Sequence, residues 1–189
     1  KTKSITLFIN NIQKAQSLSN SLSYSFIAND NPTSKNEIKI IASDTANVKD
    51  SSTFVIMRNP VIKNLPLPAG NQIGISYDAM GSLILALYAP QKNFVYVISD
   101  FSDWKVDTVF FMNRYEPKPD SVIWWIKMPV SLLSGMPKSE VAYQFLIDGN
   151  LRIYDPYSDK ILDQNNDPNI PSTVYPNLKS YPRDKTSGL

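Results

Sequence analysis

The chain has 189 residues, of which 42% are hydrophobic, and its 19 basic and 17 acidic side chains leave a net charge of +2. So small a charge, with basic residues scattered along the chain, argues against nucleic acid or an anionic membrane as a partner. Cysteine and histidine are both absent, which excludes disulfides, Ser-His-Asp and Cys-His sites, and the usual zinc centres.

Residues 1–62 are predicted to form a partial immunoglobulin-like β module. Apolar and polar residues alternate along several short runs, which is typical of strands with one buried face. Only four or five strands are expected, fewer than the seven or so of a complete immunoglobulin sandwich, so the module is predicted to be incomplete. The expected strands are residues 5–9, 22–26, 38–42 and a run around Phe54 and Ile56, with turns at residues 29–32 and 43–52.

Residues 71–156 are predicted to form a second β-sandwich. Short β-rich runs recur with turn signals between them, as in sandwich proteins. Asp148-Gly149 stands between two apolar runs and predicts a tight hairpin, because glycine tolerates a positive φ. The expected strands are residues 83–88, 94–99, 108–112, 122–128, 141–147 and 151–154.

Proline-rich segments flank the second module. Residues 63–70 are predicted to be a linker, and a fairly rigid one, because proline restricts the backbone and cannot donate to a β-ladder. Residues 157–189 are predicted to be an extended tail, since prolines, Asn and Asp replace the strand pattern there. The predicted fold class is therefore all-β, with two immunoglobulin-like β-sandwich modules, the first incomplete, and an extended C-terminal tail.

The most distinctive segment runs from residue 97 to 104 and reads Val-Ile-Ser-Asp-Phe-Ser-Asp-Trp. A strand ends there in a short polar loop that carries Trp104. Such a tryptophan can close the edge of its own sandwich, or it can stack on the apolar face of a sugar ring. Composition alone favours the first of these two roles.

An ordered series of segments resembles the N-terminal module of family-13 glycoside hydrolases, the α-amylase superfamily, which is a carbohydrate-binding module of family 48. The resemblance covers residues 71–188, and the final part of it, residues 157–188, resembles the connection into a catalytic barrel. The matching pieces are residues 83–90 ending in Ala-Pro, the loop at 94–104, residues 124–129 ending in proline, Tyr-Gln-Phe-Leu-Ile-Asp-Gly at 143–149, and Asp-Pro-Tyr at 155–157.

This resemblance implies a carbohydrate-binding surface made of Trp104, Gln144 and Asn150. Glycan-binding members of the family use two tryptophans, a lysine and a polar residue. The first tryptophan falls on Trp104 and the lysine on Gln144, but the second tryptophan falls on Leu151. Loss of one stacking partner is expected to cost roughly 1–3 kcal/mol, or about tenfold to a hundredfold in affinity. Packing against the barrel is therefore the preferred role.

Trp125 and Tyr157 are the predicted interface residues. Trp124 and Trp125 must point to opposite faces if their segment is a strand, so one belongs to the core and the other to the outer face. The simplest partner for that outer face is the catalytic barrel of the same protein.

The acidic residues are interpreted as turn residues rather than as catalytic groups. Asp100, Asp103, Asp148 and Asp155 all occupy positions where aspartate is favoured for turn chemistry. The catalytic carboxylates of the superfamily lie on barrel strands that this chain lacks. Calcium could bind Asp100 and Asp103 chemically, but their spacing does not support it. No catalytic residue, metal site or cofactor is predicted.

The predicted function is that of a non-catalytic N-terminal accessory region of an α-amylase-type enzyme acting on starch or glycogen. Its partners would be its own barrel and, weakly, α-glucan. The alternative is a tandem β-sandwich interaction or adhesion protein without a carbohydrate role. No nucleic acid is expected, and no membrane span, because no apolar run approaches about 20 residues. A secreted or cell-envelope location is expected. The reaction of the parent enzyme, whether hydrolysis, debranching or branching, stays open.

Overall fold

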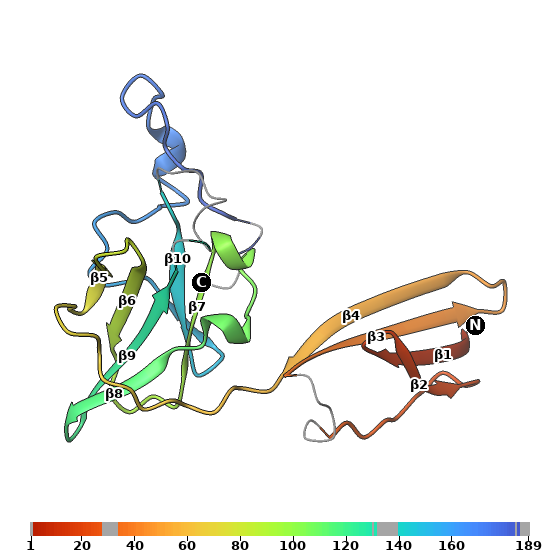
Figure 1. The fold of residues 1–189 in the computed structure, drawn as a ribbon. Coiled ribbons are helices and arrows are strands. Elements are labelled where there is room, and N and C mark those ends of the chain that lie inside the picture. Colours follow the sequence, from red (N-terminus) through yellow and green to blue (C-terminus); the bar gives the residue numbers. More distant parts are fainter. Residues whose placement is uncertain (1, 28–33, 130, 132–139, 184, 186–189) are drawn as a thin grey trace. The chain divides into compact units, whose positions relative to one another are not determined.

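The computed structural model describes residues 2–27, 34–129, 131, 140–183 and 185. Within them the chain is all-β, as predicted, and forms three antiparallel sheets (Figure 1). The chain divides into two compact units, Lys1–Pro60 and Val61–Leu189, so the predicted end of the first module at residue 62 falls just after the observed one. None of the helical segments described could span a membrane.

In the part of the chain that is described, the first unit is a single four-stranded sheet. Its strands are arranged in the order β2-β1-β3-β4, with β1 and β2 joined by a two-residue turn at Asn10 and Asn11. Both asparagines have positive φ angles, 51° and 64°, as a tight type I′ hairpin turn requires. The strands are β1 (Thr2–Ile9), β2 (Ile12–Ser17), β3 (Lys35–Asp44) and β4 (Lys49–Met57).

One face of this sheet carries a small core. Leu7, Ile9 and Ile38 are buried there, and Leu22 and Phe26 pack onto them from the connection between β2 and β3. The strand predicted at residues 22–26 is therefore wrong: its alternating apolar residues cover a sheet face, but the segment does not join a ladder. The turn predicted at residues 29–32 lies outside the described residues.

The second unit is a sandwich of two sheets that face one another across a common core. One sheet has the order β11-β10-β7 and the other β5-β6-β9-β8. Leu85 and Trp124 from one sheet meet Val97 and Phe145 from the other, and all four side chains are fully buried. Burial of each aliphatic or Phe side chain contributes about 1.5–3 kcal/mol. The strands are β5 (Gly74–Tyr77), β6 (Leu83–Tyr88), β7 (Val95–Ser99), β8 (Asn113–Lys118), β9 (Ser121–Met128), β10 (Tyr143–Ile147) and β11 (Leu151–Ile153).

The predicted hairpin at Asp148-Gly149 is confirmed as the turn between β10 and β11. Asp148 and Gly149 have φ angles of 52° and 79°, the signature of a type I′ turn. The carboxylate of Asp148 also accepts backbone N–H bonds from Asn93 at 2.8 Å and Phe94 at 3.1 Å. This turn therefore fixes the start of β7 as well as its own hairpin.

The strand predicted at residues 108–112 is wrong. Residues Thr108–Phe110 form a short 3-10 turn, η3, because the Asp107 side chain caps it by accepting the Val109 N–H at 3.0 Å. The strand that follows, β8, was not predicted. Its Glu116, Pro117 and Lys118 hide the β pattern, since proline and charged residues are depleted in strands.

The first residues of the predicted linker at 63–70 are bound to the edge of the sandwich. The Arg114 N–H donates to the Lys63 carbonyl, and the Leu65 N–H donates to the Arg114 carbonyl, both at 2.9 Å. The Trp125 indole N–H then donates to the Leu65 carbonyl at 2.9 Å. This segment thus extends the sheet beyond β8, because its own N–H and C=O groups find partners there.

Candidate functional site

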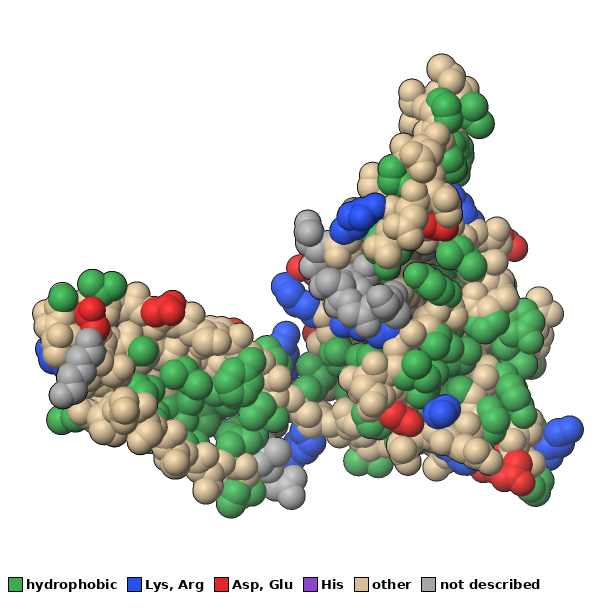
Figure 2. Space-filling view, turned by 180° about the vertical axis from the view of Figure 1, so that it is seen from behind, with side chains coloured by type: hydrophobic (Ala, Val, Ile, Leu, Met, Phe, Trp, Pro, Cys, Tyr) green, Lys and Arg blue, Asp and Glu red, His purple; other side chains and the backbone are tan. Residues whose placement is uncertain are grey.

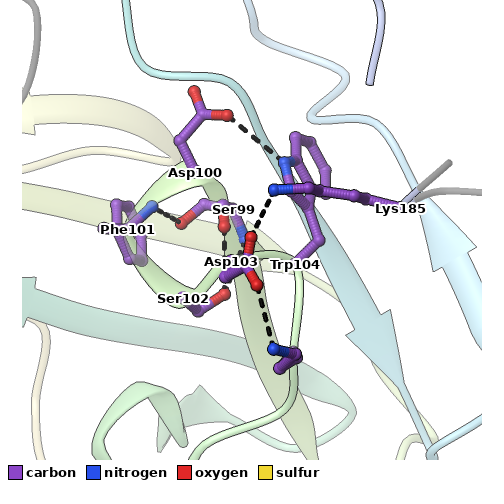
Figure 3. A network of polar contacts seen from close by, with 8 residues as sticks. Ser99, Asp100, Phe101, Ser102, Asp103, Trp104 and Lys185 are labelled. Carbon is purple, nitrogen blue, oxygen red and sulfur yellow. Dashed lines mark hydrogen bonds and ion pairs between the residues drawn. The ribbon is translucent and has the colours of Figure 1, made fainter. Parts of the chain in front are cut away.

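The loop that carries Trp104 begins as a capped 3-10 turn, η2 (Asp100–Ser102) (Figure 3). The Ser99 hydroxyl accepts the Phe101 N–H at 3.1 Å, while the Ser102 hydroxyl accepts the Ser99 N–H at 3.0 Å. These reciprocal bonds form a capping box, which satisfies backbone donors that a short turn leaves unpaired. The end of β7 is therefore converted into a rigid loop.

Trp104 lies at the end of this loop in a strained backbone. Asp103 and Trp104 have φ angles of 50° and 58°, in a left-handed region that costs non-glycine residues about 1–2 kcal/mol each. Trp104 is only 7% exposed, and its indole N–H donates to the Asp100 carboxylate at 3.2 Å. The ring is thus closed off from solvent and its polar atom is already bound.

Trp104 lines a cavity of about 400 Å³. One wall comes from β10 and the residues that precede it, a second from the Trp104 loop, and a third from the tail. The lining is mixed, with aromatic and aliphatic side chains interspersed with charged ones. Its principal residues are Trp104, Gln144, Tyr154, Ile161, Lys179 and Tyr181.

The structure brings two of the three predicted glucan-binding residues together. Trp104 and Gln144 line the same cavity, and Gln144 is 2% exposed. Among the residues described, none hydrogen-bonds the Gln144 Oε1. Asn150 lies instead in the exposed hairpin turn beyond the far end of β10, and Leu151 beside it is 46% exposed. The predicted set of Trp104, Gln144 and Asn150 is therefore not one surface.

The tail, residues 157–189 of the sequence, is tied to the Trp104 loop by two ion pairs. Lys179 Nζ lies 2.8 Å from Asp100 Oδ2, and Lys185 pairs with Asp103 (Figure 3). The hydrogen bonds from Lys185 and then from Lys105 lower the pKa of Asp103 to about 2. The predicted extended linker is thus held on the sandwich by its lysines, which the sequence pattern did not single out.

A third contact fixes the tail further along the cavity. Lys160 Nζ lies 2.7 Å from Glu140 Oε1 and 2.8 Å from the Tyr175 hydroxyl. The hydrogen bond from Lys160, followed by that from Tyr175, lowers the pKa of Glu140. The carboxylate is therefore held ionised between a cation and a phenol.

The point where the chain leaves the sandwich is built around Asp155, which is 2% exposed. The Tyr143 hydroxyl donates to one carboxylate oxygen at 2.5 Å, and the Tyr157 N–H donates to the other at 2.9 Å. Burial, together with this bond to Asp155, raises the pKa of Tyr143. Tyr143 and Asp155 both lie in segments that the sequence analysis quoted, Tyr-Gln-Phe and Asp-Pro-Tyr. The sequence did not predict that the two side chains bind one another.

The two predicted interface residues differ in exposure. Trp124 belongs to the core cluster between the two sheets and Trp125 lies outside that cluster, so the two rings lie on opposite faces of β9. Trp125 is only 8% exposed, however, and its N–H is bound by Leu65. Tyr157 is 59% exposed. Of the predicted pair, Tyr157 is therefore the residue open to a partner in this structure, while Trp125 already meets the chain's own segment.

Three of the acidic residues named from the sequence accept backbone hydrogen bonds. Asp100 and Asp148 accept backbone N–H groups, and Asp155 does the same for Tyr157. In the described part of the chain, no cluster of three or more acidic side chains is placed to hold a metal ion.

A scan against protein-family models and a search of curated proteins both find no match for this chain. The resemblance to a family-48 carbohydrate-binding module therefore stays a prediction, which depends on the ordered segments between residues 83 and 157.

Proposed function

We propose that this chain is a non-catalytic accessory region of an α-amylase-type enzyme acting on α-glucans, and that its main role is to position the catalytic barrel. The observation that supports this role is the docked tail. The segment that the resemblance assigns to the connection with the barrel is fastened to the sandwich by Lys179, Lys185 and the Tyr143–Asp155 bond. A secreted or cell-envelope location belongs to the same proposal.

A docked tail limits how freely the next domain can move. Exposed ion pairs contribute little singly, but the tail is also held by a buried carboxylate at Asp155 and by the Glu140–Lys160–Tyr175 group. Several anchors along one segment remove the freedom that a proline-rich linker would otherwise keep. A domain that follows would therefore start from a defined point and in a defined direction.

Direct glucan contact is the subordinate part of the proposal. A stacking platform must offer a ring face to the sugar, whereas Trp104 is 7% exposed. We therefore expect the chain alone and its Trp104→Ala variant both to migrate unretarded in native gels that contain amylopectin or glycogen. Retardation of the unaltered chain that disappears in Trp104→Ala would instead make glucan binding its primary role.

The positioning role is tested on the polypeptide that carries this chain. We expect its reading frame to encode a family-13 barrel beyond residue 189. In that enzyme, removal of Val61–Leu189 should lower the thermal midpoint of the barrel. A reading frame that encodes no barrel would contradict the proposal. The proposal would also be contradicted if removal of the accessory region changed neither the stability nor the activity of the barrel.

One observation favours the alternative, a β-sandwich interaction protein without a carbohydrate role. Figure 2 shows hydrophobic side chains gathered on the visible face of the first unit. Phe54 and Val55, on the edge strand β4, are 48% and 46% exposed, and exposed apolar edge strands are sites for association. Two results together would favour this alternative. The reading frame would encode no barrel, and the chain would self-associate in a way that the Phe54→Ser/Val55→Thr variant does not.

A further inference from the structure

We propose that residues 179–183 act as a removable strap over Trp104, and that the Lys179–Asp100 and Lys185–Asp103 pairs hold the strap closed. Opening the strap would turn Trp104 from a buried side chain into an exposed stacking surface. The proposal adds a control element to the accessory region, and it rests on the proposed function only for the identity of the ligand, an α-glucan.

The strap and Trp104 line the same cavity. Lys179, Tyr181 and Pro182 share its lining with Trp104. A cavity of about 400 Å³ in this position indicates that the tail bridges the site without filling it. The tail can therefore leave the cavity with few close-packed contacts to break, since close packing is what makes a core resist separation.

Asp100 connects the strap to the tryptophan directly. One of its carboxylate oxygens accepts the Trp104 indole N–H at 3.2 Å, while the other lies 2.8 Å from Lys179 Nζ and accepts the Ala142 N–H at 3.0 Å. The same carboxylate thus holds the strap and orients the indole. Release of Lys179 leaves the loop intact, because the Ala142 and Trp104 bonds do not depend on it.

The second pair is placed to respond to ionic strength. The Lys185 and Asp103 side chains are 52% and 53% exposed, against 26% and 25% for Lys179 and Asp100. Screening shortens the range of electrostatic attraction from about 8 Å at physiological salt to about 3 Å at 1 M. Salt should therefore loosen the Lys185 end of the tail first and the Lys179 end second.

The backbone at Trp104 supports a role beyond packing. Two successive non-glycine residues, Asp103 and Trp104, have positive φ angles, although a buried plug could be supplied from unstrained backbone. Strain of this kind persists only where the surroundings hold it, and it gathers at ligand sites and switches.

Acrylamide quenching of tryptophan fluorescence tests the strap. The three tryptophans are at positions 104, 124 and 125, and the last two are 0% and 8% exposed. We expect a severalfold rise in the quenching constant for Lys179→Gln/Lys185→Gln, and a smaller rise for the unaltered chain in 1 M NaCl. Adding Trp104→Phe to the double variant should abolish the rise. Lys127→Gln is the matched control, because it removes an ion pair with Asp78 of 2.6 Å away from the strap.

The outcomes separate cleanly. A folded double variant, with an unchanged circular dichroism spectrum, that is quenched no more than the unaltered chain overturns the strap. So does an equal rise in Lys127→Gln or a rise that survives Trp104→Phe.

Native gels with amylopectin then test the ligand. Retardation of the Lys179→Gln/Lys185→Gln protein, lost when Trp104→Ala is added, supports α-glucan as the molecule that competes with the strap. Raised quenching without retardation leaves the strap standing and contradicts the glucan part of the proposed function.

Discussion

The Tyr143 hydroxyl donates a 2.5 Å hydrogen bond to the buried Asp155 carboxylate, which joins strand β10 to the point where the tail begins. A bond between a phenol and a carboxylate is stronger than one between neutral groups. This contact therefore holds both the sandwich edge and the start of the tail.

Replacement of Tyr143 by phenylalanine should destabilise the second unit by about 1–3 kcal/mol, because it leaves a buried carboxylate short of one donor. Urea unfolding measures the change. Tyr88→Phe is the matched control, since Tyr88 is 48% exposed and should change the free energy of unfolding little. Equal effects of the two substitutions would contradict the importance of the bond.

Asp148 should tolerate asparagine better than alanine. Asn can keep the left-handed conformation and offers one acceptor oxygen to the Asn93 and Phe94 N–H groups, while Ala offers none. We expect Asp148→Ala to cost about 1–2 kcal/mol and Asp148→Asn clearly less, as measured by thermal and urea unfolding. An equal loss for both would mean that the carboxylate charge, and not the acceptor, holds the turn.

Gly74 and Gly70 form a matched pair. Both have positive φ angles, 92° and 81°, but a Cβ added at Gly74 would lie 2.7 Å from the Tyr157 Cβ, whereas one at Gly70 meets nothing within 4 Å. Gly70→Ala should cost about 1–2 kcal/mol for its backbone alone. Gly74→Ala should cost distinctly more, because the Tyr157 Cβ is close to the main chain and cannot swing away. Unfolding midpoints that fall equally would show that Tyr157 does not rest on β5.

Asp103 should titrate at unusually low pH. Its pKa is lowered from 3.8 to about 2, chiefly by the hydrogen bond from Lys185. The ionised Asp103 therefore contributes to the stability of the folded state above pH 3.8, and this contribution is lost as the pH falls through 2. Carbon NMR of the side-chain carboxyl measures this pKa directly. In Lys185→Gln it should rise toward 3.8, while Lys127→Gln should leave it unchanged. A normal pKa in the unaltered chain would show that Lys185 does not bind there.

The sequence predicted those elements whose structure is decided by a few neighbouring residues. The turn at Asp148-Gly149 and strand β6 were predicted because a dipeptide signal and a continuous apolar run decide them. Asn10-Asn11 carried the same kind of turn signal and would have revealed β2, whose own residues, Ile-Gln-Lys-Ala-Gln-Ser, are too polar to be noticed as a strand.

The candidate site was only partly predictable, because its decisive contacts join distant residues. Trp104 and Gln144 were selected by resemblance, but the cavity that they share is also lined by tail residues such as Lys179 and Tyr181, and the tail looked like an extended linker. Lys185 and Asp103 lie 82 residues apart, and no periodicity or spacing rule connects an isolated lysine to a particular aspartate. Asn150 does not join Trp104 and Gln144, because strand β10 runs from the cavity to the hairpin turn that holds Asn150.

The long separation of Lys185 from Asp103 also sets an order of events during folding. Closing a large loop costs entropy before the contact can offset it, so the tail can bind only after β7 and β10 have paired and the Trp104 loop exists. Residues 179–183 should then be the last part of the second unit to gain protection from amide hydrogen exchange, and the first to lose it. In a cell, a protease would therefore cleave this segment before any strand of the sandwich had opened.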